Sequence, residues 1–308
     1  MADYLPQLLQ QLFNGLSLGA IYALIAIGYT MVYGIIGMIN FAHGEVYMVG
    51  AYAGLVTLSA IGMQSGLPIP LIIAAMILVA VMVTGAYGYA VEKIAYAPLR
   101  GSPRLVPLIS AIGMSIFLQN WVALGQGARD MAVPTLVTGS LRIQFGEHFQ
   151  FSASYARMMI IGVTVVLMIL LSLYIKYSRM GRASRASSQD LGMANLLGID
   201  TNRVISFTFV IGAMLAAVGG VLIALAIGKL NPFIGFIAGI KAFTAAVLGG
   251  IGSIPGAMLG GVILGLAETF AAAYLSSQYK DIVAFMLLVL ILLFRPTGLL
   301  GKPEVEKV

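Results

Sequence analysis

The sequence contains no cysteine and only two histidines, His43 and His148, among its 308 residues. The absence of cysteine excludes disulfides, thiolate nucleophiles and cysteine-ligated metal or iron–sulfur sites. Two histidines are also too few for a histidine-rich metal site. We therefore expect no metal centre and no cofactor in this chain.

Charge is equally scarce: 9% of the residues are charged, 60% are hydrophobic and the mean hydropathy is +1.00. A soluble domain carries about 25% charged residues. No residue from Tyr4 to His43 is charged at neutral pH, a run far longer than the roughly 20 residues that one helix needs to cross a bilayer. Lipid offers no hydrogen bonds to the backbone, and the alternation of a barrel strand is missing. The sequence therefore predicts an all-α, polytopic membrane helical bundle.

Apolar runs between charges and turn signals give nine candidate spans within one membrane domain, 1–308. Glycine, proline and polar residues in 33–60 and 231–276 could mark broken helices, so eight or ten spans are also compatible with the sequence. The nine spans are 8–32, 36–60, 68–91, 105–125, 156–175, 205–227, 234–252, 255–276 and 281–294.

The distribution of lysine and arginine indicates the orientation. Of the 17 basic residues, most lie in the three segments 92–104, 176–204 and 295–308, which the positive-inside rule places in the cytoplasm. The N-terminus is then outside, the C-terminus is cytoplasmic, and 126–155 is an outer loop. The net charge of +6 does not require a nucleic-acid partner, because lysine and arginine accumulate on the cytoplasmic loops of membrane proteins, where anionic lipids also attract them.

Many of the 37 glycines recur with a spacing of four residues, as in Gly15/Gly19 and Gly261/Gly265. This spacing lets helix backbones approach closely in lipid, and packing within the chain is the favoured interpretation. Segments 23–50 and 222–250 also resemble each other faintly, each an apolar helix that leads into a glycine-rich break. That similarity hints at an internal duplication, which is common in transporters.

Ionisable residues inside a membrane usually have a function or a partner. Asn40, His43, Gly44 and Glu45 form a polar cluster in an apolar region, where the side chains could exchange hydrogen bonds. The cluster is either a broken helix that lines or gates a translocation pathway, or a polar knot that locks two helices together. Glu268 is a second intramembrane acid, for which we favour the outer interface over the pathway.

The segment 176–204 is a polar, basic island between two apolar spans. Ser187 precedes Asp190 by three residues, the spacing of a capping box, and Gly198 stands where a helix would end in a left-handed cap. The sequence thus predicts a helix of roughly ten residues, too short to be stable alone in water. Its small apolar face would consist of Leu191, Ala194 and Leu197.

Soluble enzyme signatures are missing. The chain has no GxxxxGK[ST] phosphate loop, no GxSxG elbow and no HExxH pair. If ATP drives this protein, another polypeptide must bind it.

Three motifs carry a family resemblance: INFAHGEVYMVGAY (39–52), SRMGRASRASSQDLGMANLLGID (178–200) and AVLGGIGSIPGAMLGG (246–261). Together they resemble the permease subunits of bacterial branched-chain amino-acid ABC importers, closest to the LivH type. The resemblance covers essentially the whole chain. It implies an inner-membrane complex with a second, related permease, two cytoplasmic ATPase subunits that bind ATP and magnesium, and a periplasmic amino-acid-binding protein.

The resemblance also implies that the island is a coupling helix inserted into a groove of the ATPase. Many importer permeases carry E-A-A-x-x-x-G there, whereas this chain keeps only Ala194 and Gly198 of that pattern. Polar contacts would then come from Arg185 or Asp190.

Two other classes stay open. An ion-coupled secondary amino-acid transporter would use Glu45 and Glu268, the two strong intramembrane carboxylate candidates. A membrane-embedded enzyme is disfavoured by the lack of a nucleophile–base or metal-ligand set.

Overall fold

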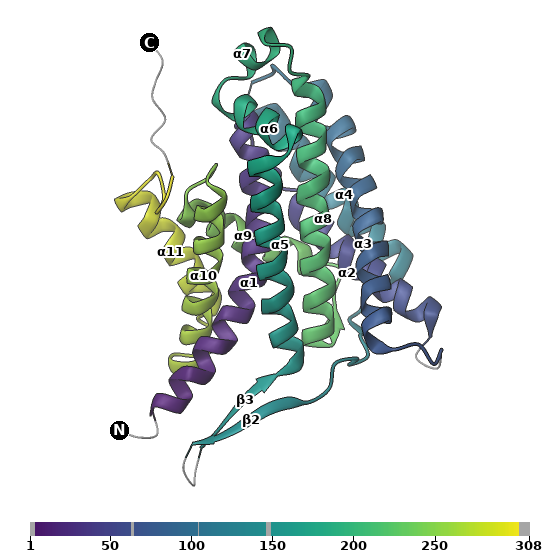
Figure 1. Cartoon of the computed structure of the whole chain (residues 1–308), viewed down its shortest axis with the longest axis vertical. Coiled ribbons are helices and arrows are strands. Elements are labelled where there is room, and N and C mark those ends of the chain that lie inside the picture. Colours follow the sequence, from purple (N-terminus) through teal and green to yellow (C-terminus); the bar gives the residue numbers. More distant parts are fainter. Residues whose placement is uncertain (1–3, 63–64, 104, 146–148, 302–308) are drawn as a thin grey trace.

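The computed structural model describes residues 4–62, 65–103, 105–145 and 149–301. In this part of the chain the protein is a bundle of long helices with short irregular elements at both ends (Figure 1). We call the end that carries α6 and α7 the tip end, and the end that carries strands β2 and β3 the hairpin end.

Seventeen elements follow one another along the chain. They are α1 (Tyr4–Ile36), α2 (His43–Ile61), α3 (Ile69–Val91), a π-helix (Glu92–Tyr96), a 3₁₀ turn (Ala97–Leu99), α4 (Leu105–Gln126), β1 (Met131–Ala132), β2 (Ser140–Phe145), β3 (Phe149–Ser154), α5 (Tyr155–Tyr177), α6 (Arg179–Gln189), α7 (Leu191–Leu196), α8 (Thr201–Ile227), β4 (Lys229–Leu230), α9 (Ile234–Gly249), α10 (Ile254–Tyr274) and α11 (Lys280–Phe294).

Seven of the described helices are long and apolar enough to cross a membrane, which confirms the polytopic helical class. Helices α9 and α11, with 16 and 15 residues, are shorter than a full span. The predicted span 36–60 was wrong at its start, because helix α1 continues to Ile36 and α2 begins only at His43. The total number of spans and the orientation of the termini remain predictions.

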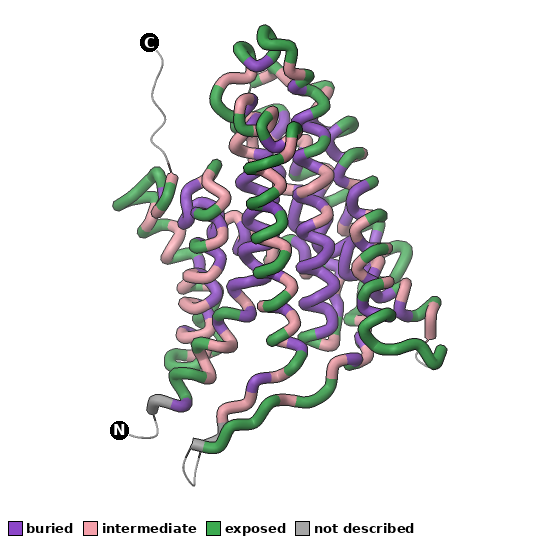
Figure 2. Tube along the Cα trace, in the orientation of Figure 1, coloured by how far each residue is buried: buried purple, intermediate pink, exposed green. Residues whose placement is uncertain are grey.

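Helices α1 and α8 form the centre of the bundle, and Figure 2 shows buried residues concentrated along them. Helix α1 packs against α5, α8, α9 and α10. At the α1–α10 crossing, a Cβ on Gly265 would collide with the backbone of Gly19, and one on Gly261 would collide with Ala23. The four-residue glycine spacing therefore serves packing within this chain, as predicted.

Segments 23–50 and 222–250, which resemble each other in sequence, have the same order of local structural elements. Each long helix, α1 or α8, is followed by a glycine with positive φ (Gly37, 64°; Gly228, 75°), and then by a helix with a glycine in its first turn. Those first turns meet, because a Cβ on Gly235 of α9 would strike the Gly44 carbonyl of α2. The breaks thus bring two helix N-termini together inside the bundle.

The outer loop contains structure that the sequence analysis did not anticipate. Strands β2 and β3 form an antiparallel hairpin, with Ser140 paired to Ser154, and β1 pairs with β4. The hairpin is tied to α1 because the Ser152 amide donates to Gln10 Oε1 at 2.9 Å, while Gln10 Nε2 donates to the Ser152 carbonyl at 3.1 Å.

The polar island folds as two short helices, so the single predicted helix with a Ser187 cap was wrong. Ser178 caps α6 by accepting a bond from the Gly181 amide at 2.8 Å. Ser187 lies inside α6 with its hydroxyl buried and unpaired among the described residues. Asp190 is itself the N-cap of α7, accepting from the Met193 amide at 3.0 Å. A cap requires extended backbone, which Asp190 has and Ser187, within a helix, does not.

Candidate functional site

Glu45 is a fully buried carboxylate in the first turn of α2. Its Oε1 accepts hydrogen bonds from Gln119 Nε2 at 2.7 Å and from Ser115 Oγ at 3.1 Å, both on α4. Its Oε2 has no hydrogen-bond partner among the described residues and lies against Gly235, in the first turn of α9. The positive ends of two helix dipoles therefore face one carboxylate, which lowers the cost of burying its charge.

His43 and Asn40 point to other partners. The His43 ring stacks edge-on against Tyr29 with centroids 4.9 Å apart, and its Nε2 has no hydrogen-bond partner in the part of the chain described. Asn40 Oδ1 accepts from the Ala42 amide and from the Tyr96 hydroxyl, each at 3.1 Å. The expected hydrogen bonds among the three cluster side chains are thus absent from the described structure. Each side chain instead contacts a different element: Glu45 contacts α4, His43 contacts α1 and Asn40 contacts the π-helix.

Glu268 lies inside the bundle and is 4% exposed. Its Oε1 is 2.6 Å from Lys241 Nζ, and its Oε2 accepts from the Tyr22 hydroxyl at 2.7 Å. Lys241 also lies 2.6 Å from Asp281 Oδ1. One lysine therefore connects α9, α10 and α11, and the tyrosine adds α1. Sequence reasoning singled out Glu268 but missed Lys241, although a lone lysine in the apolar run 234–249 was the available signal.

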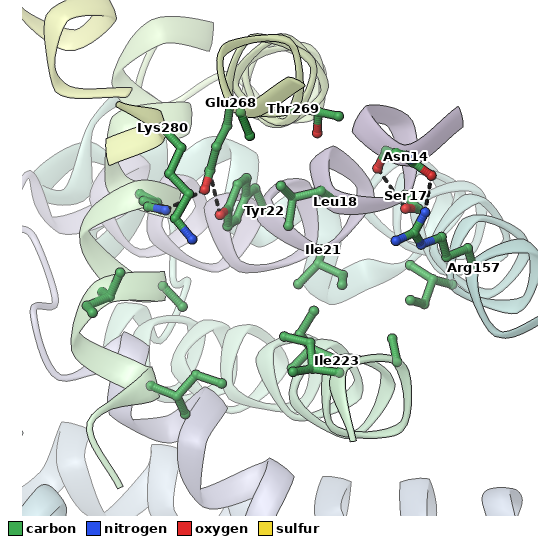
Figure 3. A pocket seen from close by; sticks show the side chains of 18 of the residues that line it. Asn14, Ser17, Leu18, Ile21, Tyr22, Arg157, Ile223, Glu268, Thr269 and Lys280 are labelled. Carbon is green, nitrogen blue, oxygen red and sulfur yellow. Dashed lines mark hydrogen bonds and ion pairs between the residues drawn. The ribbon is translucent and has the colours of Figure 1, made fainter. Parts of the chain in front are cut away.

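A cavity of about 640 Å³ borders this ion cluster, within the size range of small-molecule sites. Figure 3 shows polar groups at both ends and apolar side chains between them. Glu268, Tyr22 and Lys280 lie at one end. Arg157, Asn14 and Ser17 lie at the other, where the Arg157 guanidinium donates to Asn14 Oδ1.

A third buried acid, Glu92, is the first residue of the predicted cytoplasmic segment 92–104 and is fully buried. It begins the π-helix after α3, and its carboxylate pairs with Arg100 and with Lys93, the latter at 3.3 Å. Ser206 Oγ of α8 donates to it at 2.8 Å. π-Helical turns often occur at functional sites, and this one ties α3 to the helix that follows the tip.

At the tip, α7 ends as the sequence predicts. Gly198 adopts a φ of 82°, and the Ile199 amide donates to the Ala194 carbonyl at 3.0 Å, the closing bond of a left-handed cap. Asp200 then caps α8 by accepting from the Arg203 amide at 3.1 Å.

The three residues of the predicted apolar face do not all face the same way. Ala194 is buried and Leu191 is partly buried against the bundle, whereas Leu197 points outward. We define the tip surface as Met193, Leu196 and Leu197, which are 55%, 83% and 73% exposed. Arg185 is exposed on α6, where its guanidinium donates to the Lys176 carbonyl at 3.4 Å.

The long apolar helices and the charges buried between them define a multi-pass membrane protein. A family model described as "Branched-chain amino acid transport system / permease component" matches residues 11–292, so the chain belongs to this family of inner-membrane permeases.

Curated relatives agree with that family. The chain is 58% identical over 308 residues to the high-affinity branched-chain amino acid transport system permease protein LivH of Salmonella typhimurium, covering 100% of both chains. It is 59% identical over 302 residues to BraD of Pseudomonas aeruginosa, covering 97% of this chain and 98% of that protein. It is also 27% identical over 307 residues to LivM of Salmonella typhimurium, covering 93% and 69%.

Proposed function

We propose that this chain is the permease subunit of an ABC importer that moves leucine, isoleucine and valine from the periplasm into the cytoplasm. The observation that carries the proposal is the end-to-end identity of 58–59% with two permeases named for high-affinity branched-chain amino acid transport. The family consists of permease components, so we assign no catalytic residue and no cofactor to the chain itself. ATP and magnesium would bind to partner subunits.

The proposed complex contains a second permease, two cytoplasmic ATPases and a periplasmic binding protein. The similarity to LivM supports a related second permease. The hairpin end would face the periplasm and the tip end the cytoplasm, as the positive-inside rule predicts. The outer loop 126–155 is then available to the binding protein.

The tip surface would bind the ATPase. Its three exposed apolar side chains belong to α7 and its C-cap residue. Helix α7 lies at the end of the bundle, beyond the long apolar spans (Figure 1), where exposure of such side chains to water is unfavourable unless a partner covers them. Motion of the tip would reach the bundle through α8, because Thr201 Oγ1 donates to Asn195 Oδ1 at 2.9 Å. Among the other predicted contacts, Arg185 and Asp190 would supply polar groups to the ATPase. Glu45, His43 and Glu268 would line or control the pathway.

Reconstitution tests the proposal. Vesicles that hold this chain with its partners should accumulate leucine only when ATP and the binding protein are present. A protonophore should leave the initial uptake rate unchanged. Uptake by this chain alone, driven by a proton gradient, would contradict the proposal and favour the ion-coupled transporter.

A further inference from the structure

Arg157 lies where local electrostatics disfavours a cation. Helix α5 begins at Tyr155, so Arg157 stands in the first turn, at the positive end of the helix dipole. The side chain is partly buried and donates to the neutral Asn14 amide oxygen, and no described carboxylate forms an ion pair with it. A partly buried cation without an anionic partner is costly, so an anion from outside the chain would be favoured there.

The charge of the cavity supports the same conclusion. Three cationic side chains line it, namely Arg157, Lys241 and Lys280, against the single carboxylate of Glu268. That carboxylate is already occupied by Lys241 and Tyr22. Even with Asp281, which pairs with Lys241 from outside the lining, three cations face two carboxylates. Arg157 is separated from the Glu268 carboxylate by the apolar middle of the cavity (Figure 3).

The surroundings of Arg157 complement the rest of an apolar amino acid. Gln11, Asn14 and Ser17 line the same cavity, and their side-chain oxygens are hydrogen-bond acceptors. The Asn14 oxygen already accepts from Gln10 and Arg157, so the Gln11 and Ser17 oxygens would receive an ammonium group. Aliphatic side chains line the cavity as well, among them Ile160 and, beside the polar groups in Figure 3, Ile21 and Ile223. Such a pocket combines an apolar wall with a few polar groups that fix orientation, as small-molecule sites do.

We propose that the Arg157 end of this cavity is a binding subsite for the transported amino acid. Arg157 holds the α-carboxylate, the amide and hydroxyl oxygens hold the ammonium, and the branched side chain packs against Ile21 and Ile223. The inference rests on the proposed import function and adds to it a site of substrate recognition within the permease. The subsite lies near the hairpin end, which the proposed orientation turns toward the binding protein.

A phospholipid acyl chain fits the cavity less well. The far end presents Lys241, Glu268 and Tyr22, whose polar atoms would be placed against hydrocarbon. A short amphiphile that is charged at one end would not reach the far end, so it would place no hydrocarbon against Lys241, Glu268 and Tyr22.

The test is direct binding of radiolabelled leucine to the assembled complex, without binding protein, in nanodiscs of phosphatidylcholine. Leucine is expected to bind, and leucinol, which lacks the carboxylate, is expected to bind about 10- to 100-fold more weakly, the range typical of a lost charged hydrogen bond. Arg157→Gln should weaken leucine binding by a similar factor and abolish the difference between leucine and leucinol. Arg157→Lys should retain part of the preference for the carboxylate.

Two further variants sharpen the test. Arg142→Gln removes a charge from the exposed strand β2, outside the cavity lining, and should leave leucine binding unchanged. Ala226→Trp narrows the cavity without altering its charge and should weaken leucine binding more than alanine binding. Equal binding of leucine and leucinol to the wild-type complex would overturn the subsite. So would an Arg157→Gln variant with wild-type leucine binding, or a dependence on Arg157 seen only for added phosphatidylglycerol.

The import function is judged separately. ATP-driven uptake by the wild-type complex, with the binding protein present, decides the proposed function. If that uptake occurs while Arg157→Gln binds and transports leucine normally, only the subsite fails.

Discussion

Lys241 Nζ lies 2.6 Å from Glu268 Oε1 and 2.6 Å from Asp281 Oδ1, so one buried lysine serves two carboxylates on two other helices. Lys241 and Glu268 are each 5% exposed at the side chain, whereas Asp281 is 47% exposed. This asymmetry determines which substitutions the cluster can tolerate.

Lys241→Met should destabilise the protein more than Glu268→Gln. Losing the lysine leaves Glu268 buried without a cation, which costs about 3–5 kcal/mol. In Glu268→Gln the lysine keeps Asp281 and the amide oxygen can still accept from Tyr22, so the cost should be about 1–3 kcal/mol. Unfolding in mixed micelles measures both. Lys229→Met, which removes an exposed pair with Asp130, is the control and should cost less than about 1 kcal/mol. A larger loss of stability in Glu268→Gln than in Lys241→Met would contradict this interpretation of the ion cluster.

Gly28→Ala should be poorly tolerated because the added methyl would collide with the buried imidazole of His43. Overpacking of this kind costs about 1–3 kcal/mol. Gly113→Ala, in α4 with open space around the position, is the matched control and should be nearly neutral.

The collision has a specific signature. In a His43→Ala background, Gly28→Ala should cost less than it does alone, a coupling that a double-mutant cycle measures from thermal unfolding. If the destabilisation by the two substitutions were additive, the methyl group would collide with a residue other than His43.

At the tip, Asp190→Ala should loosen α7, while Ser187→Ala should not. Asp190 accepts from the Met193 amide as N-cap, an interaction worth about 1 kcal/mol, whereas the buried Ser187 hydroxyl has no partner among the described residues. Hydrogen exchange of the amides in 190–198 reports this local stability. If exchange were faster in Ser187→Ala and unchanged in Asp190→Ala, Ser187 and not Asp190 would be the residue that caps the helix.

Leu196→Glu and Leu197→Glu should weaken the contact with the ATPase and so reduce the stimulation of ATP hydrolysis by substrate. Both side chains are largely exposed, so the chain should fold normally, but a carboxylate would be buried wherever the ATPase covers the tip surface. We expect a loss of about tenfold or more in substrate-stimulated ATPase activity, because interface hot spots are worth about 2 kcal/mol or more. Ser188→Glu, exposed on α6 outside the tip surface, is the control. Full stimulation in both leucine variants would exclude the tip surface as the ATPase contact.

Features governed by local composition could be predicted well. The end of α7 at Gly198 depends only on residues within one turn, and this prediction was confirmed. The Ser187 cap failed because its three-residue spacing to Asp190 fits a capping box, yet α6 runs through Ser187 and the helix break falls at Asp190. Spacing alone does not determine where a break falls within a continuous helical pattern.

Partners across the bundle could not be predicted. The Tyr22–Glu268 bond joins residues 246 positions apart, and no periodicity along either helix identifies the other. For the same reason Arg157 escaped notice: its position beside Asn14 and the cavity depends on how α5 packs against α1.

The sequence by itself determined that this protein is helical, lies in the membrane and carries a polar tip, because hydropathy and backbone hydrogen bonding act locally in lipid. The tertiary structure alone decided which buried charges meet. Glu45 between two helix N-termini and Lys241 between two carboxylates depend on the close approach of α2, α9, α10 and α11. Glycine contacts set the approach of α2 to α9 and of α9 to α10, and the Lys241–Asp281 pair adds α11, so no single segment of the chain determines it.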